Sequence, residues 1–495
     1  MQKPIPTIRF LLALVLCAPI SKMSAGSPIA ADTWEIMAAG SAIASYGIKA
    51  DGRVPVAVKN PGTELWHAQI RHGFPVERGH RYRFTANLTG NAPQSIPVWI
   101  QQNAEPHEIL GQATADVRGD NTDGTTGAKP ATRFEFVATE NDSVYVLFAL
   151  GRDAHPAFTI ESASLEDLGL VEGFDWERAD LRPGSPDYAP RVNFGRRLEP
   201  KDGVLHGAGQ DEVAFKEYVT AIGETDVQPR IFMDYAGLYE DWTPRIENWR
   251  RTFRASDELT DSPLTLQLGL YLVDGALARF NVDGTDAELD RIATSLETLN
   301  APIFLRIGYE PNGFWNNYPP EEYIKAFRRI STYLRNRIPN LAVVWCIVAR
   351  QGGMEAAVKW YPGDEYVDWW GIDLFSTSDL FHPETHDFLI ESERRKFPVM
   401  IGEATPRFVG VAPAEKAWSL WFEPFFALIR QQHTIKAFCY INWDWPVWSE
   451  KLDQDWANWG DARIQTSPNL LPLLRAELSL PLYNNATHTT ETDDN

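Results

Sequence analysis

Two glutamates in this chain each follow an apolar run that is typical of a buried strand. Glu310 lies in FLRIGYEPNGFWNNY, residues 304–318, and Glu403 lies in PVMIGEATPR, residues 398–407. Burial disfavours the charged form of a carboxylate, so two such strand-end glutamates need a chemical reason. A pair of this kind suits acid chemistry in which one carboxyl donates a proton and the other attacks or stabilises a cation. Cleavage of a bond between two sugars uses that chemistry.

The segment around both glutamates alternates strand-like and helix-like patterns. Eight strand–helix units between residues 203 and 475 predict a (β/α)₈ barrel, or TIM barrel, within an α/β domain at 199–478. The helix expected at 321–337 is amphipathic. The strands are expected at residues 204–206, 230–233, 264–271, 303–307, 341–347, 369–374, 399–402 and 436–441.

Such a barrel has its active site at the C-terminal ends of its strands. Glu310 then follows strand four and Glu403 ends strand seven, and we predict this pair as the catalytic residues. Other polar and aromatic residues are expected at the same face as substrate-binding residues: Arg306, Tyr309, Asn312, Trp315, His206, Asp373, Trp443 and Trp445.

Several of these residues also have a purely structural interpretation. Arg306 and Glu310 could form a salt bridge, and His206 and Asp373 could anchor strand ends. The two tryptophans on strand eight fit either a stacking platform under a sugar or core packing.

In a retaining mechanism, one ionised carboxylate attacks the anomeric carbon and the other, protonated carboxyl gives its proton to the leaving oxygen, with the two carboxyls about 5–5.5 Å apart. Glu403 needs a positive or hydrogen-bonding neighbour, and Arg306 is the nearest candidate. The charge on Glu403 should raise the pKa of Glu310.

Residues 32–170 are predicted to form an all-β sandwich of the jelly-roll type before the barrel, because short alternating runs are separated by polar, glycine-rich turns. The turn at 118–129 is expected to be a plain loop, with a cation-binding loop as the alternative. Residues 171–198, with several prolines and no period, are expected to be a linker.

Residues 1–26 are typical of a secretory signal peptide. Lys3 and Arg9 precede a short apolar run, and small residues follow, so we predict cleavage near residue 26 and a secreted or periplasmic protein. Cys17 weakly resembles a lipoprotein cleavage site, but the large Leu16 before it disfavours a lipid anchor. The polar, acidic segment 479–495 is expected to be a disordered tail.

The net charge of −21 excludes nucleic acid and anionic membranes as favoured partners and points to a neutral glycan. After the signal peptide only Cys346 and Cys439 remain, and two buried thiols fit them better than a disulfide. No His/Cys cluster has metal-ligand spacing and no glycine-rich phosphate loop appears, so no metal or cofactor is predicted. No other apolar run is long enough to span a membrane.

The barrel segment resembles the clan A retaining (β/α)₈ glycoside hydrolases, and is most similar to family 26, the β-mannanase group. That family's strand-four motif is R-x-x-H-E-x-N-G-x-W, and this chain has RIGYEPNGFW at 306–315. Residues 367–373 are similar to the strand-six pattern V-D-x-x-G-x-D, and 398–403 to the strand-seven pattern. The resemblance implies a secreted, retaining endo-β-glycosidase that degrades a polysaccharide without a cofactor, with Glu310 on strand four as acid/base and Glu403 on strand seven as nucleophile.

Two positions depart from that family: Tyr309 replaces a His, and Phe375 replaces a Tyr near the nucleophile. These departures leave the substrate open between mannan, β-glucan, β-1,3-xylan and algal galactans. They also keep a non-catalytic glycan-binding protein as the alternative function; a transglycosylase with the same residues is a third. We expect a monomer.

The N-terminal domain resembles carbohydrate-binding modules of families 4 and 9, through residues 65–69, 79–82 and 158–165. The resemblance implies a sugar-binding face, for which we predict Trp66, Gln69, Trp99 and Gln101; core packing is the alternative for the two tryptophans.

Overall fold

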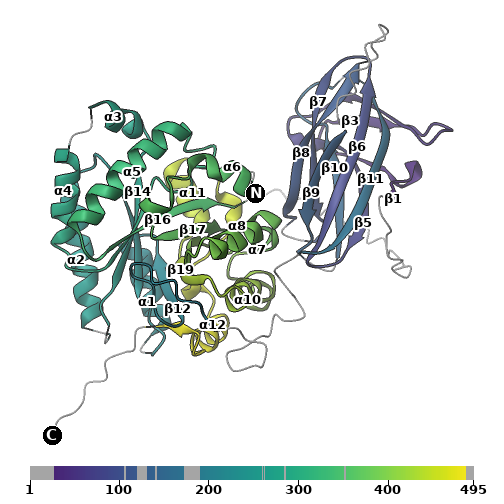
Figure 1. Ribbon diagram of the computed structural model, residues 1–495. Helices are drawn as coiled ribbons and strands as arrows, with labels where there is room; N and C mark the ends of the chain where they lie inside the picture. The colour runs from purple at the N-terminus through teal and green to yellow at the C-terminus, as the bar shows by residue number, and fades with distance from the viewer. Residues whose placement is uncertain are drawn as a thin grey trace, which may run out of the picture.

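The protein is described by a computed structural model that covers residues 27–104, 107–119, 131–139, 142–155, 157–171, 190–223, 225–258, 260, 262–283, 286–349 and 353–485. The predicted signal peptide with Cys17, most of the 118–129 turn and most of the 171–198 linker lie outside these residues. Figure 1 shows an N-terminal all-β body beside a larger body in which helices surround strands.

The N-terminal domain is all-β, as the sequence predicts. Its sheet runs β2-β5-β10-β7-β8-β6-β11-β4-β3, with β1 paired to β11 and β9 to β6. Buried and half-exposed residues alternate along β6, so one face covers an apolar core that includes Phe84, Phe136 and Phe148. The domain begins before residue 32, because β1 pairs with β11. The strands are β1 Ser27–Pro28, β2 Glu35–Ala38, β3 Ile43–Tyr46, β4 Val54–Asn60, β5 Ala68–Val76, β6 His80–Gly90, β7 Gln94–Gln102, β8 Ile109–Gly119, β9 Thr132–Val137, β10 Asp142–Ala149 and β11 Phe158–Leu170.

The second body is a closed barrel of parallel strands, which confirms the predicted fold class. Strands β13 to β19 pair in chain order, and β12 pairs with both β19 and β13 to close the ring. Every residue of β15 to β19 is buried, as expected for parallel strands covered by helices. The strands are β12 Val204–Gly209, β13 Ile231–Gly237, β14 Thr265–Tyr271, β15 Ile303–Ile307, β16 Leu341–Val348, β17 Trp369–Leu374, β18 Val399–Ala404 and β19 Ile435–Ile441.

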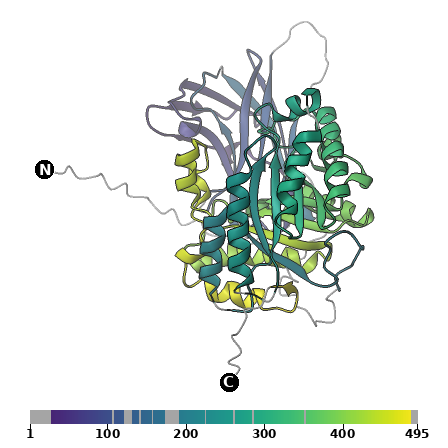
Figure 2. The same cartoon turned by 90° about the vertical axis from the view of Figure 1, so that its left-hand side faces the viewer.

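Helices cover the outside of the barrel (Figure 2). The amphipathic helix predicted at 321–337 is α5, which buries Tyr323, Phe327, Ile330 and Leu334 against the strands. Among the described helices, none is both long and apolar enough to cross a membrane. The helices are α1 Glu212–Ile222, α2 Thr243–Asp257, α3 Ala276–Asp283, α4 Asp286–Glu297, α5 Pro320–Arg337, α6 Gly353–Ala357, α7 Thr377–Phe381, α8 Pro383–Arg394, α9 Ala414–Ala417, α10 Glu423–Gln431, α11 Trp445–Leu452 and α12 Leu471–Leu478.

The start of the predicted disordered tail is instead part of the barrel. Residues Tyr483–Asn484 form a short strand, β20, which pairs in parallel with the first residues of β12. Leu482 and Tyr483 are buried in the barrel core. The prediction of disorder from residue 479 is therefore wrong for residues 479–485. The prediction followed the polar composition of the region and overlooked these two side chains, which pack into the barrel core. Residues 486–495 lie outside the described part.

We predict that a chain ending at residue 481 has a melting temperature several degrees below that of the full chain. Burying a Leu or an aromatic side chain contributes about 1.5–3 kcal/mol, and this truncation exposes the surface that Leu482 and Tyr483 cover. A chain ending at residue 485 is the control, because it keeps every contact of β20. Equal melting temperatures for the two truncations, measured by calorimetry, would show that β20 contributes nothing.

Candidate active site

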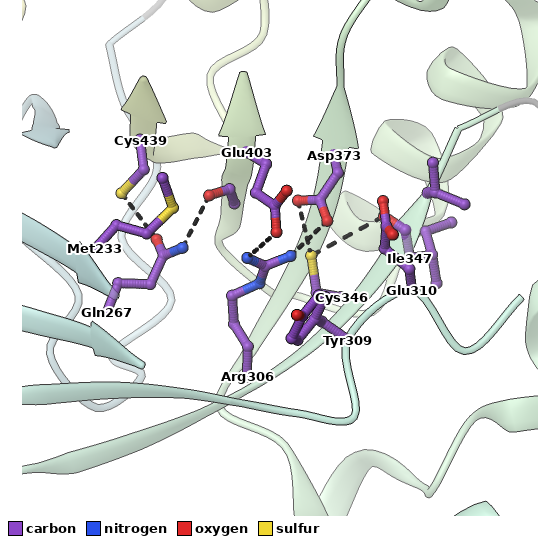
Figure 3. A network of polar contacts seen from close by, with 12 residues as sticks. Met233, Gln267, Arg306, Tyr309, Glu310, Cys346, Ile347, Asp373, Glu403 and Cys439 are labelled. Carbon is purple, nitrogen blue, oxygen red and sulfur yellow. Dashed lines mark hydrogen bonds and ion pairs between the residues drawn. The ribbon is translucent and has the colours of Figure 1, made fainter. Parts of the chain in front are cut away.

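Glu403, on β18, is bound by an arginine from another strand of the barrel. Arg306, on β15, donates from Nη1 to Glu403 Oε1 at 2.8 Å and from Nη2 to Asp373 Oδ2 on β17. Figure 3 shows the guanidinium between the two carboxylates. The geometry confirms Arg306 as the cation beside Glu403. Arg306 forms salt bridges with Asp373 and Glu403 rather than with Glu310.

Burial assigns Arg306 and Asp373 a positioning role. Both side chains are fully buried, which contradicts the prediction that they bind substrate directly. Burial lowers the pKa of Arg306, but the charge of Asp373 and then of Glu403 more than compensates and raises it well above its usual value. Arg306 therefore stays charged, and it fixes the position of the carboxylate that has to react.

A second layer of contacts supports this ion pair. Asp373 Oδ1 accepts a hydrogen bond from the Cys346 thiol at 3.3 Å. Gln267 donates to the carbonyl of Gly402 at 2.8 Å and accepts from the Cys439 thiol at 2.8 Å. Both cysteines are free and buried, so the thiol interpretation of the sequence is confirmed. Within the described residues, no three His, Cys, Asp or Glu side chains are grouped to bind a metal.

Glu310 follows β15, and one of its two carboxyl oxygens has no hydrogen-bond partner among the described residues. Its Oε2 accepts from Trp315 Nε1 at 2.9 Å, while its buried Oε1 has no hydrogen-bond partner among the described residues. The residue has φ of 51°, a left-handed conformation that costs about 1–3 kcal/mol in a non-glycine residue and concentrates at functional sites. Its N–H donates to the carbonyl of Cys346 at 2.9 Å, which fixes this turn.

The environment of Glu310 favours its protonated form. Burial raises the pKa of Glu310 well above its usual value, and the charges of Asp373 and Glu403 raise it further. Arg306 and the indole N–H of Trp315 oppose this rise without cancelling it. The predicted effect of Glu403 on Glu310 is confirmed, although burial is the larger cause. The site therefore combines a carboxyl whose environment favours the protonated form with an arginine-bound glutamate.

Two tyrosines lie next to Arg306, and sequence reasoning assigned only one of them. The Tyr309 ring lies 4.8 Å from the guanidinium of Arg306 and 5.3 Å from the ring of Tyr235, at the end of β13. Strand register explains the pairing, because Tyr235 lies opposite Gly269 and Gly269 lies opposite Arg306. A side chain at Gly269 would come within 2.4 Å of the Tyr235 ring. The sequence signal for Tyr235 is its place near the C-terminal end of the second barrel strand.

The loop after Glu310 is fixed by hydrogen bonds. Asn312 donates to the carbonyl of Val348 at 2.8 Å and accepts from its N–H at 3.0 Å. Its side chain is thus held at the end of β16, and its predicted role in binding sugar stays a prediction. Trp315 is 47% exposed, and Tyr309 is half-buried, so both remain available to substrate as predicted.

The prediction that His206 binds substrate is wrong. Its ring is buried in contact with Phe438, with Nε2 at 2.7 Å from the Tyr218 hydroxyl and Nδ1 at 3.1 Å from Asn485 Oδ1. Burial lowers the pKa of His206 to about 3, so the ring is neutral. The error came from the strand end: β12 continues to Gly209, which leaves His206 in the middle of the strand.

Trp443 and Trp445 belong to an aromatic cluster in the segment after β19. Trp443 stacks on Trp448 at 4.3 Å and donates to Asp211 at 2.7 Å. Trp445 contacts Trp459 at 4.5 Å and donates to Thr405 at 2.9 Å. These contacts favour core packing, but both side chains are buried to about the same degree as Glu310 and Glu403, so stacking under a sugar stays a prediction.

In the N-terminal domain, strand register places three of the four predicted sugar-binding residues on one face. Leu147 pairs with Arg71 on one side and with Trp99 on the other, so Gln69 and Gln101, each two residues along, share that face. Trp99 and Gln101 are half-buried and Gln69 is buried. Trp66, in the preceding turn, is 50% exposed, so it is not a core residue.

We predict that Gly402→Ala destabilises the protein by about 1–3 kcal/mol, the usual cost of overpacking. A Cβ at this position would lie 2.7 Å from Asp373 Oδ1 and 2.9 Å from Arg306 Nε, so the ion pair would have to move. Gly47→Ala is the matched control, because its Cβ would meet only Pro55 at 3.5 Å. Urea titration of both variants tests this, and equal midpoints would argue against a tightly packed ion pair.

Comparison with known proteins finds a family match over the region that carries these residues. The sequence model of Glycosyl hydrolase family 26 matches residues 276–408, which include Arg306, Glu310 and Asp373. The β-1,3-xylanase TXYA of Vibrio sp. is 25% identical over 311 residues, which are 58% of this chain and 67% of the xylanase. A β-1,3-xylanase of Alcaligenes sp. is 25% identical over 321 residues, 58% of this chain and 66% of that protein.

The aligned segments thus span about two thirds of each curated relative. Among solved structures, an endo-β-1,4-mannanase double mutant of Cellulomonas fimi is 18% identical over 57% of this chain and 72% of its own, with a TM-score of 0.43. The family match over the strand-four to strand-seven region identifies the chain as a glycoside hydrolase most similar to glycosyl hydrolase family 26.

Proposed function

We propose that this protein is a secreted, retaining endo-β-glycosidase, with Glu403 as nucleophile and Glu310 as acid/base. One observation carries the proposal: the carboxyl that follows β15 and the carboxyl on β18 have opposite environments. Glu403 is paired with a buried arginine, whereas Glu310 has a raised pKa and an oxygen without a partner. A carboxyl with a raised pKa is suited to act as an acid, and a carboxylate held by an arginine is suited to act as the nucleophile.

In the first step, an oxygen of ionised Glu403 attacks the anomeric carbon as the bond to the leaving oxygen breaks. The leaving oxygen takes the proton of Glu310, so no free alkoxide forms. Arg306 keeps one Glu403 oxygen in a hydrogen bond, which orients the carboxylate while its other oxygen reacts. The sugar is then covalently attached to Glu403, and Glu310 is left ionised.

In the second step, Glu310 acts as a base. It takes a proton from water, the water oxygen attacks the anomeric carbon, and Glu403 leaves as a carboxylate. Two inversions at one carbon retain its configuration. The loss of charge on Glu403 in the covalent intermediate removes part of the repulsion that keeps Glu310 protonated, so the same residue can switch roles between the steps.

For the substrate we propose a neutral β-glycan, with β-1,3-xylan the first to test. The two curated relatives are β-1,3-xylanases, and the negative charge of the chain suits an uncharged polymer. The face formed by Gln69, Trp99 and Gln101, with Trp66 nearby, is proposed to bind the same polysaccharide, because aromatic and amide side chains suit sugar rings and hydroxyls. Signal-peptide cleavage and a monomeric state complete the proposal.

We predict that the mature protein releases reducing ends from one glycan of a panel led by β-1,3-xylan, and that Glu403→Gln abolishes this release. An amide cannot replace the carboxylate as nucleophile. Glu310→Gln should slow polysaccharide cleavage by about 10²–10⁴-fold, the usual contribution of general acid catalysis, and should affect activated aryl glycosides less. Proton NMR should show that the first product keeps the anomeric configuration. Retention on a glycan without cleavage would support the binding-protein alternative.

We predict that Trp315→Phe shifts the alkaline limb of the kcat/KM profile to higher pH. Activity falls as pH rises through the pKa of Glu310, because the acid must be protonated. The Trp315 N–H stabilises the ionised carboxylate and so lowers that pKa, and removing it raises the pKa further. Trp66→Phe, in the other domain, is the control. An unmoved limb in Trp315→Phe would exclude this contact as a determinant of acidity.

A further inference from the structure

Phe314 is an aromatic side chain that the site described so far does not use. It is 79% exposed and lies between Glu310 and α5, beside Trp315. Single exposed apolar residues are common on protein surfaces and need no explanation. This one differs because of its place: its ring centroid lies 5.0 Å from that of Trp315, and the indole of Trp315 donates to the carboxylate of Glu310.

The loop presents Phe314 in a fixed position. Asn312 is bound to Val348, and Asn316 donates to the carbonyls of Tyr309 and Glu310 at 3.0 Å each. The N–H of Gly313 donates to the Glu310 carbonyl at 2.9 Å, and a Cβ at Gly313 would lie 2.5 Å from the Trp315 ring. A ring on such a loop loses little conformational freedom when a ligand covers it, which favours binding.

The proton transfer from Glu310 indicates which part of a substrate lies beside the Phe314 ring. The acid must reach the oxygen between two sugars, and that oxygen departs with the leaving-group sugar. The leaving-group sugar therefore lies on the Glu310 side of the bond, and the loop that carries Phe314 follows directly from Glu310. An exposed aromatic face is suited to the apolar face of a sugar ring.

We propose that Phe314 is the platform for the leaving-group sugar. The proposal rests on the proposed function, since it takes Glu310 as the acid. Phe314 contacts the sugar that departs in the first step and, in transfer reactions, the sugar that accepts. It makes no contact with the sugar attached to Glu403, so its effect depends on the leaving group alone.

The test compares two substrates that share the sugar attached to Glu403. One is an oligosaccharide, whose leaving group is a sugar; the other is the corresponding β-glycosyl fluoride, whose leaving group is a fluoride ion too small to cover a ring. Phe314→Ala should lower kcat/KM for the oligosaccharide roughly tenfold to a hundredfold, the range expected for uncovering one aromatic side chain. It should leave kcat/KM for the fluoride unchanged, and Phe314→Tyr should restore the oligosaccharide rate.

Val282→Ala is the matched control, because Val282 is 81% exposed on α3 and should leave both rates unchanged. Equal losses on the two substrates, or no loss on either, would overturn the assignment while leaving the proposed function intact. If the unaltered protein cleaves neither substrate, the proposed function fails and this inference fails with it. Melting temperatures of the variants show that any loss is not one of folding.

Discussion

The guanidinium of Arg306 is stable in the barrel interior only because carboxylates neutralise it. A buried ion is expensive, and the loss of one partner of a buried pair is more destabilising than the pair is stabilising. Arg306 comes from β15, Asp373 from β17 and Glu403 from β18, so the three strands must keep their spacing and register. Gly402 on β18 leaves the space that this charged group occupies. The thiol of Cys346 donates a hydrogen bond to Asp373.

The carboxylates of the same ion pair also act on Glu310. Burial is the main cause of the raised pKa of Glu310, and the negative charges of Asp373 and Glu403 raise it further against the opposing charge of Arg306. Tyr309 and Tyr235 pack against each other beside Arg306.

The sequence was sufficient where one local pattern decides the structure. Apolar runs gave the barrel strands, and the strand-end rule gave Glu310, Glu403 and the partnership with Arg306. It was insufficient where the result depends on how far an element extends or on what packs over it. His206 was misplaced because β12 continues for three residues beyond the predicted end of the strand. The contacts of Trp443 with Trp448 and of Trp445 with Trp459 could not be predicted, because no spacing along the chain reveals which tryptophans pack together.

The pairing of β20 with β12 has a consequence for how the chain is made. The first barrel strand finds its partners β19 and β20 only at the far end of the sequence, since Leu205 pairs with both Ala437 and Asn484. A ribosome-bound chain can complete its N-terminal domain early, because all the strands of that domain have been synthesised by then. Its barrel has to wait as an open sheet with unpaired edges until β19 and β20 emerge, and those edges favour aggregation during that interval.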